Sequence, residues 1–368
     1  MVMSTSDLTA SSPRPAGGPR FAYVGCFTTE RRKARGKGID IYAIDPVSGA
    51  WSRTGHVGDL VNPSFLVMDA ARSVLYAVHG DADYVSAFAV DRQTGALRQI
   101  AKAASGGMNG VHQALDPTGQ FLVVANYSSG SVALLPVRPD GALDDVSHRL
   151  DLPGAPGPHR TEQTIAHPHH IVCSPGGRFL LVPDKGLDRV FVLRLDVAAG
   201  TLSVASEATM RPGAGPRHMV FHPTLPFAFV VNELDSTVAT CRWHEETGVL
   251  EPLHLVSALP PDFFGASTTA AIVITPDGRH VYISNRGQDG ITRLGFDAGS
   301  EMLVVRGWTP ANGRDPRFMT LSPDGKRLIV AAEQGDFISH FVINEADGNL
   351  TPGGAALPSA SPCTIAFF

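Results

Sequence analysis

Residues 215–250 read GPRHMVFHPTLPFAFVVNELDSTVATCRWHEETGVL, and this stretch predicts one four-stranded antiparallel sheet. Apolar or alternating runs at 217–221, 227–231 and 237–241 have the composition of half-buried and sandwiched strands. A Pro-containing turn separates the first two runs, and a Glu-Thr-Gly turn leads to a fourth strand near Leu250. The stretch is therefore one compact module of four strands.

The turn between the first two strands of this module recurs along the chain. It occupies residues 69–72, 116–119, 174–177, 222–225, 275–278 and 322–325. Successive turns are 47, 58, 48, 53 and 47 residues apart. A period of roughly 40–50 residues, built from strands alone, is typical of a β-propeller.

Seven modules can be assembled if the two ends of the chain share one. Six complete modules begin near Pro63, Val111, His169, Arg217, Ala270 and Arg317. Strands at 21–25, 39–43 and 51–57 lack a first strand, and the run 363–368 can supply it. We therefore predict an all-β, seven-bladed β-propeller over residues 21–368, a single domain whose C-terminal strand completes the N-terminal blade. Such closure removes open sheet edges.

Composition narrows the classes of partner. The formal net charge of −5 disfavours a nucleic-acid-binding protein, and no apolar run is long enough to span a membrane. Residues 1–20 are rich in Ser, Thr, Pro and Gly and lack the apolar segment of a signal peptide. We read them as a disordered tail and expect a cytoplasmic protein. The sequence does not determine the oligomeric state.

The repeat also predicts which residues meet. The first two strands of a module are antiparallel and joined by the turn, so the start of one and the end of the other lie together at the opposite end. In a propeller that end is one mouth of the central channel. First strands place there His112, His169, His170, Arg217, His218 and Arg317. Second strands end at Asn126 and Tyr127, Asp184 and Lys185, Asn232 and Glu233, Asn285 and Arg286, and Glu333 and Gln334.

These side chains predict a site for a small anionic, oxygen-rich ligand. Arg grips carboxylate or phosphate with two parallel hydrogen bonds, and His is a general base near neutral pH. The alternative is that polar residues at strand ends merely cap the blades. A metal centre is a further alternative, because His112, His170 and His218 share one repeat position. Neighbours on a strand point to opposite sides, however, which argues against a shared ion for His169 and His170.

Several stretches together resemble a known family. They are VANYSSGSV at 124–132, HPH at 167–169, GPRH at 215–218, VNELDS at 231–236 and SNRG at 284–287. In this order they resemble the seven-bladed propeller lactonase family, which includes propeller-type 6-phosphogluconolactonases and the fungal 3-carboxy-cis,cis-muconate lactonising enzyme. The resemblance spans about residues 21–368 and implies catalysis without a metal or cofactor. It places the catalytic roles on His169, Arg217, Glu233 and Arg286.

We expect the remaining mouth residues to contact the substrate. They are His112, Tyr127, Lys185, His218, Arg317 and Gln334. One departure from the family is Ala271, where relatives usually have Glu, and Glu333 stands where they commonly have Asn. The basic run at 31–35 either covers the mouth and attracts anions or is solvated surface.

Three functions follow from this reading. The leading hypothesis is a hydrolase of a sugar or sugar-acid lactone, with 6-phosphogluconolactone as one candidate substrate. His169 would activate water, Arg217 and Arg286 would hold charge, and Glu233 would orient a partner or donate a proton. The alternatives are a cycloisomerase that closes a muconate-type dicarboxylate to a lactone, and a propeller that only binds other proteins.

Overall fold

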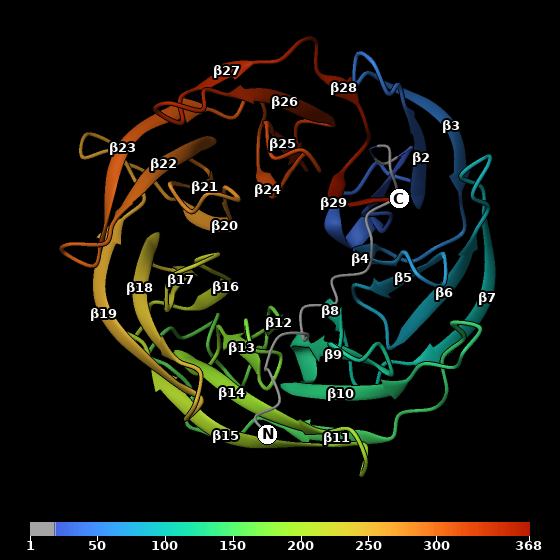
Figure 1. Ribbon diagram of the computed structural model, residues 1–368, viewed down its shortest axis with the longest axis horizontal. Coiled ribbons are helices and arrows are strands. Elements are labelled where there is room, and N and C mark those ends of the chain that lie inside the picture. Colours follow the sequence, from blue (N-terminus) through green and yellow to red (C-terminus); the bar gives the residue numbers. More distant parts are fainter. Residues whose placement is uncertain (1–17, 19) are drawn as a thin grey trace, which may run out of the picture.

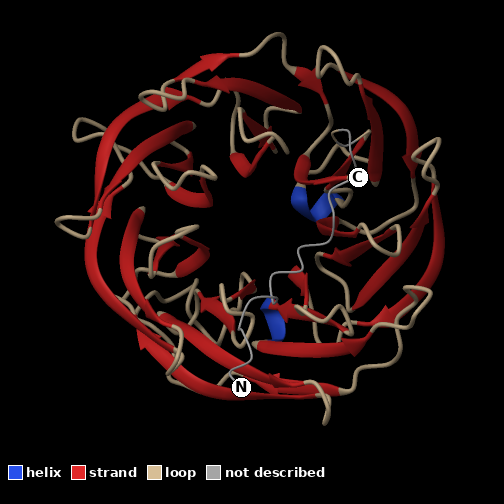
Figure 2. Ribbon diagram, viewed as in Figure 1, coloured by secondary structure: helices blue, strands red, loops and turns tan. Residues whose placement is uncertain are grey.

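The protein was analysed as a computed structural model that describes residues 18 and 20–368. Seven sheets stand around a central channel, as Figures 1 and 2 show. The predicted seven-bladed propeller is therefore confirmed. The predicted disordered tail, residues 1–20, lies outside the described residues except for Gly18 and Arg20.

We number the blades along the chain and name their strands from the channel outward. Blade 1 consists of β29 (Pro362–Phe367), β1 (Phe21–Cys26), β2 (Ile39–Ile44) and β3 (Trp51–Val57). Blade 2 consists of β4 (Pro63–Asp69), β5 (Val74–His79), β6 (Tyr84–Val90) and β7 (Leu97–Ala104). Blade 3 consists of β8 (Gly110–Leu115), β9 (Phe121–Asn126), β10 (Ser131–Pro136) and β11 (His148–Asp151).

The second half of the ring repeats this order. Blade 4 consists of β12 (Val172–Cys173), β13 (Leu180–Asp184), β14 (Arg189–Asp196) and β15 (Thr201–Thr209). Blade 5 consists of β16 (Pro216–Phe221), β17 (Phe227–Asn232), β18 (Thr237–His244) and β19 (Val249–Ser257). Blade 6 consists of β20 (Thr268–Ile274), β21 (His280–Arg286), β22 (Gly290–Asp297) and β23 (Met302–Pro310). Blade 7 consists of β24 (Pro316–Leu321), β25 (Arg327–Ala332), β26 (Phe337–Ile343) and β27 (Leu350–Pro352), with β28 (Leu357–Pro358) also on β26.

The ends of the propeller meet in blade 1. β29 pairs antiparallel with β1 from Ala22 opposite Phe367 to Cys26 opposite Pro362. Backbone hydrogen bonds also join Phe21 and Phe368 in both directions, at 2.9 and 3.0 Å. The C-terminal strand thus closes the ring as predicted. Two short 3-10 helices, η1 (Glu30–Arg32) and η2 (Tyr127–Ser129), follow β1 and β9. No helix of the described part is both long enough and apolar enough to cross a bilayer.

The hydrophobic core lies between blades rather than within them. Seven buried clusters fill the seven interfaces, and each combines residues of two neighbouring blades. At the closure, for example, Val24 and Tyr42 of blade 1 pack with Ile329 and Ile338 of blade 7. The second strand of a blade is covered on both faces, which explains its fully apolar sequence. β17, for example, is buried throughout, whereas the outer strand β19 is mostly exposed or half-buried.

A bulge interrupts the inner strand at the mouth. Pro216 pairs with Asn232 and His218 with Val231, so Arg217 has no partner residue. The same extra residue occurs as Cys363, Ser64, Val111 and Arg317. In blade 6 both Ala270 and Ala271 stand opposite Ser284, since Thr269 pairs with Asn285 and Ile272 with Ile283. Bulges redirect side chains at strand ends, and here they recur at one end of the channel.

Blade 4 has the least regular inner strand. We expected it to begin at His169, but regular pairing covers only Val172 and Cys173. An isolated bridge joins Pro168 to Asp184, so four steps along this strand match three steps along β13. His169 and His170 therefore lie within the equivalent bulge.

Candidate active site at one mouth of the channel

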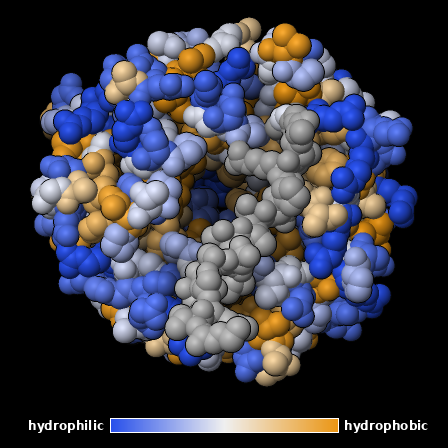
Figure 3. Space-filling model, viewed as in Figure 1, coloured by the Kyte–Doolittle hydropathy of each residue, from blue (hydrophilic) through white to orange (hydrophobic). Residues whose placement is uncertain are grey.

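The unpaired bulge residues gather around a narrow hollow at the mouth. Figure 3 shows hydrophilic residues around and within the central opening of the molecule. The hollow is lined by the bulge residues Cys363, Ser64, Val111, His169, Arg217 and Arg317, one from each blade except blade 6. Phe27 and Arg32 from the β1–β2 loop complete the rim. The side chains that share the hollow therefore come from the same position, the bulge, in six of the seven blades.

The residues that follow the bulges form a layer of packed rings in the channel. The ring centroids of Phe65 and His112 are 3.9 Å apart, those of His112 and His170 4.1 Å, and those of His170 and His218 4.5 Å. Phe318 adds an edge contact to Phe65 at 6.1 Å. These rings pack against one another, and Phe65, His218 and Phe318 among them also line the hollow.

The expected opposite orientation of His169 and His170 is wrong. Their rings lie 5.4 and 4.5 Å from the same ring, that of His218. The reason is the bulge, which breaks the strict alternation of a flat strand, so that two consecutive side chains face the channel. Arg217 and His218, which both line the hollow, behave in the same way.

Two of the layer histidines cap backbone groups of the next blade. Nδ1 of His112 accepts the N–H of Ile171 at 3.2 Å, and Nδ1 of His170 accepts that of Met219 at 3.4 Å. Burial lowers the pKa of His170 to about 3 and that of His112 well below 6.5. Both rings are thus neutral and have a structural task. His112 does not line the hollow, although we expected it to contact substrate.

The strongest charge cluster surrounds Glu233, the residue that follows β17. Its carboxylate forms an ion pair with Nη1 of Arg217, with Nζ of Lys185 at 3.0 Å and with Nη2 of Arg286 at 3.2 Å. Lys185 also reaches Glu162 at 2.6 Å. Three cations from blades 4, 5 and 6 therefore meet around one buried carboxylate, as the repeat predicted for Lys185, Glu233, Arg217 and Arg286.

The pKa shifts follow from this arrangement. Burial alone would raise the pKa of Glu233, but Arg217, Arg286 and Lys185 together lower it well below 4.5. Burial lowers the pKa of Arg217 to about 9, and Glu233 limits that decrease. At neutral pH Glu233 is ionised and Arg217 is protonated. A proton-donating role for Glu233 therefore has no support from its surroundings.

His169 is the base candidate next to this cluster. Burial, and then the charge of Arg217, lower its pKa well below 6.5, so the imidazole is neutral at pH 7. Its ring lies 5.6 Å from that of Tyr127, which stacks on His167 at 4.2 Å. Nδ1 of His169 is buried and has no hydrogen-bond partner among residues 18 and 20–368.

Some of the other residues predicted to contact the substrate line the hollow, and some do not. His218 and Arg317 line it. Tyr127 lies beside Lys185, whose Nζ is 5.6 Å from the ring centroid. Gln334 faces Glu333 at 3.4 Å and does not line the hollow. Glu333 itself pairs with Arg317 at 3.4 Å.

Sequence reasoning missed several members of the rim. Ser64, Val111 and Cys363 occupy the repeat position of Arg217, and that position alone could have identified them. Phe27 follows β1 as Glu233 follows β17. They were overlooked because none of them is a typical catalytic residue.

A larger hollow lies on the far side of the ring, between the turns of blades 3 and 4. It is lined by Pro117, Arg178, Phe179 and Arg194, among others. The one buried carboxylate in its wall, that of Asp116, already accepts hydrogen bonds from its own turn. The smaller hollow at the mouth is lined by His169 and by Arg217, which belongs to the Glu233 cluster, so we place the chemistry there. Within the described residues, no group of three His, Cys, Asp or Glu is placed to hold a metal ion.

Comparison with known proteins agrees with the seven-bladed fold. A family described as "Lactonase, 7-bladed beta-propeller" matches residues 21–367. A 6-phosphogluconolactonase from Bacillus subtilis is 30% identical over 343 residues, covering 92% of this chain and 96% of that protein. A 6-phosphogluconolactonase from Klebsiella pneumoniae is 32% identical over 302 residues, covering 82% of this chain and 86% of that protein.

Solved structures show the same likeness. The periplasmic gluconolactonase of Pseudomonas aeruginosa superposes with a TM-score of 0.85 and 29% identity, covering 94% of this chain and 98% of that one. The family match covers every strand of the ring and the whole mouth. The chain belongs to the seven-bladed β-propeller lactonase family.

Proposed function

We propose that this protein hydrolyses a sugar lactone, and that the reaction takes place at the mouth of the channel. The observation that carries the proposal is the cluster in which Arg217, Lys185 and Arg286 surround Glu233 next to neutral His169. The named relatives are 6-phosphogluconolactonases and a gluconolactonase. They support a sugar lactone as the substrate class.

The proposed chemistry uses water as the nucleophile. Neutral His169 accepts a proton as water attacks the lactone carbonyl, and the tetrahedral intermediate carries an oxyanion. Arg217 is placed to stabilise that oxyanion, since a preorganised cation in a buried site acts on charge as it develops. The ring C–O bond then breaks, and protonated His169 returns its proton to the leaving alkoxide. The product is the open-chain hydroxy acid.

Glu233 is a positioning residue in this scheme. Its ionised carboxylate holds Arg217, Lys185 and Arg286 in place. Three cations around one carboxylate leave an excess of positive charge, part of which Glu162 offsets. The remainder suits a substrate that is anionic or becomes so in the transition state.

The test is acid release by the purified protein. We would compare 6-phosphoglucono-δ-lactone with glucono-δ-lactone, subtract spontaneous opening, and repeat each assay with a chelator. We expect turnover above background that persists in the chelator. Loss of turnover in chelator would instead indicate a metal centre. Absence of turnover on both lactones would refute the proposal and favour a muconate-type lactone or a binding role.

A further inference from the structure

We propose that Arg32 and Arg317 form a second anion subsite, across the mouth from His169 and Arg217, which takes the phosphoryl group of a phosphorylated sugar lactone. This inference rests on the proposed function, because it names the substrate class of the same site. Arg32 has no role in the proposed hydrolysis, and its place on the rim is a finding of the structure.

The ring order separates Arg32 from His169 and Arg217. Arg32 ends η1, in the β1–β2 loop of blade 1, whereas His169 and Arg217 come from blades 4 and 5. In a ring of seven, blades 4 and 5 are the two most distant from blade 1. All three side chains nevertheless line one hollow. Arg32 and Arg317 therefore share the hollow with His169 and Arg217, and a substrate that reacts beside His169 can present a second group to them.

One aromatic ring holds both guanidinium groups at the rim. The Cζ atoms of Arg32 and Arg317 lie 4.5 and 5.0 Å from the ring centroid of Phe27. A cation over a ring face is attracted by the ring quadrupole and keeps its N–H groups free. Phe27 thus brings the two guanidinium groups together at the rim without using their hydrogen-bond donors.

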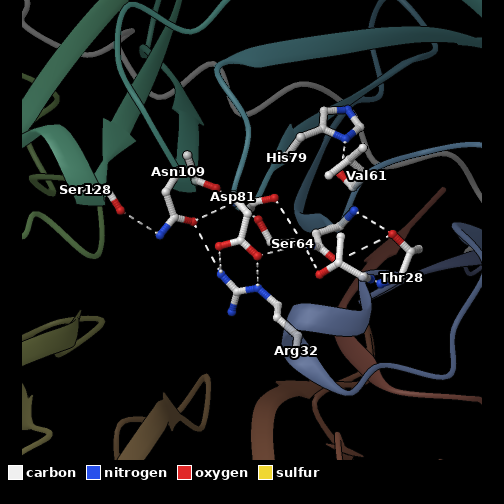
Figure 4. A network of polar contacts seen from close by, with 12 residues as sticks. Thr28, Arg32, Val61, Ser64, His79, Asp81, Asn109 and Ser128 are labelled. Atoms are coloured by element: carbon white, nitrogen blue, oxygen red, sulfur yellow. Dashed lines mark hydrogen bonds and ion pairs between the residues drawn. The ribbon is translucent and has the colours of Figure 1, made fainter.

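Arg32 is fixed in direction by its neighbours (Figure 4). Its Nε and Nη2 donate to the two carboxylate oxygens of Asp81 at 2.6 and 2.9 Å, and Nη2 also approaches Oδ1 of Asn109 at 3.4 Å. Asn62 in turn donates to Asp81 at 3.0 Å. Among the described residues Nη1 of Arg32 has no acceptor. A guanidinium that is held on two nitrogens presents its third as a preorganised donor.

Arg317 has even more free donors. It pairs with Glu333 at 3.4 Å, and no hydrogen bond from its guanidinium to another described residue exists. Burial alone would lower its pKa, but Glu333 and other nearby acidic groups raise it, so the group stays charged. A phosphate monoester offers three strong acceptor oxygens and up to two negative charges, which matches two guanidinium groups with free N–H groups. A lactone that lacks phosphate has no group to fill this subsite.

The experiment compares Arg32→Gln with Arg31→Gln, which removes the same charge from the adjacent residue. Arg31 is exposed and does not line the hollow. For Arg32→Gln we expect kcat/KM with 6-phosphoglucono-δ-lactone to fall by about 10-fold or more, mainly through KM, as for the loss of a hydrogen bond to a charged group. The loss with glucono-δ-lactone should be about 10-fold smaller. Arg31→Gln should change both values less than about 2-fold.

Equal losses on both lactones, or no loss with the phosphorylated one, would overturn the subsite. Arg32→Lys, which keeps the charge but not the fork, should lose part of the preference and replaces Arg32→Gln if that variant does not fold. If the wild-type protein hydrolyses neither lactone, the proposed function fails by itself. Binding of 6-phosphogluconate and of inorganic phosphate, measured by calorimetry, then tests the subsite separately. Weaker binding to Arg32→Gln but not to Arg31→Gln would support the subsite. Equal binding to the wild type and to Arg32→Gln would refute it.

Discussion

The inner strands of blades 5 and 6 have the same backbone irregularity and contrasting side chains. β16 places Arg217 and His218 at its bulge, and β20 places Ala270 and Ala271 there. Both following strands carry a buried Asn at or next to their last residue, and its amide donates to a Thr of the third strand, at 2.9 Å in blade 5 and 2.8 Å in blade 6. The bulge and the Asn–Thr pair therefore belong to the fold, and the bulge side chains belong to the site.

The small residue in blade 6 also has a use. Nε of Arg217 donates to the carbonyl oxygen of Ala270 at 3.0 Å. A large side chain in blade 6 would occupy the same part of the channel wall. The two bulges are thus complementary. Blade 5 supplies the guanidinium of Arg217, and blade 6 supplies the backbone carbonyl that accepts its hydrogen bond.

The largest expected effect comes from removing the centre of the blade 5 cluster. Glu233→Gln leaves Arg217, Lys185 and Arg286 without their shared counter-charge. Breaking a buried ion pair from one side costs about 3–5 kcal/mol, so the free energy of unfolding should fall by that amount. Chemical denaturation measures it. Glu251→Gln is the matched control, since it alters an exposed ion pair of the same blade and should cost less than about 1 kcal/mol.

The pH dependence of that difference checks its cause. The pKa of folded Glu233 lies well below the 4.5 of the unfolded chain, so its contribution is complete above pH 4.5 and is lost as the pH falls through the folded value. The stability gap between wild type and Glu233→Gln should be constant from about pH 6 to 8 and narrow below 4.5. A gap that stays constant at low pH would contradict the ion-pair explanation.

The second-largest effect comes from replacing Arg217 at the bulge of blade 5 by Ala, the residue type that blade 6 has at its bulge. Arg217→Ala should lower kcat/KM for the lactone by about 10²-fold or more, by analogy with a lost oxyanion donor. Steady-state kinetics on the lactone measure this. Arg242→Ala removes the half-buried pair between Arg242 of β18 and Glu301, away from the mouth, and should leave kcat/KM close to the wild-type value. Near-normal turnover in Arg217→Ala would exclude Arg217 from the mechanism.

The smallest effect should be equal in the two blades. Thr237→Val and Thr292→Val each remove the hydroxyl that accepts a hydrogen bond from a buried Asn amide, that of Asn232 and of Asn285. Each also removes the hydrogen bond that this hydroxyl donates, to Asp235 and to the carbonyl oxygen of Ala258. Each should lower the free energy of unfolding by about 1–3 kcal/mol, the cost of an unsatisfied buried donor. Thermal and denaturant unfolding of the two variants side by side measures this. A large loss in one blade only would show that the shared framework is not equivalent.

The sequence predicted the fold because its signals are local and repeated. The apolar second strands and the turns at a regular spacing predicted the blades, and the incomplete first module predicted its completion by residues 363–368. The same repeat placed His169, Arg217, Glu233 and Arg286 at one mouth. The ion pairs of Glu233 with Arg217 and Arg286 confirm that these three meet.

Other parts of the site depend on geometry that the strand pattern does not contain. A bulge adds one residue without changing composition, so the shared orientation of His169 and His170 was not predictable from alternation. The direction of Arg32 depends on Asp81, which lies in a neighbouring blade. The capping role of His112 likewise needs the position of Ile171 in the next blade.

The closure of blade 1 also determines when the protein can finish folding. β1 is buried over its whole length, and one of its edges is covered only by β29. Between Cys26 and Pro362 the ribosome must add roughly 340 residues, which takes about 20 s to a minute at about 5–20 residues per second. During that interval an apolar strand keeps an open edge that can pair with another chain. Nascent chains of this protein should therefore need protection by chaperones until the last strand emerges.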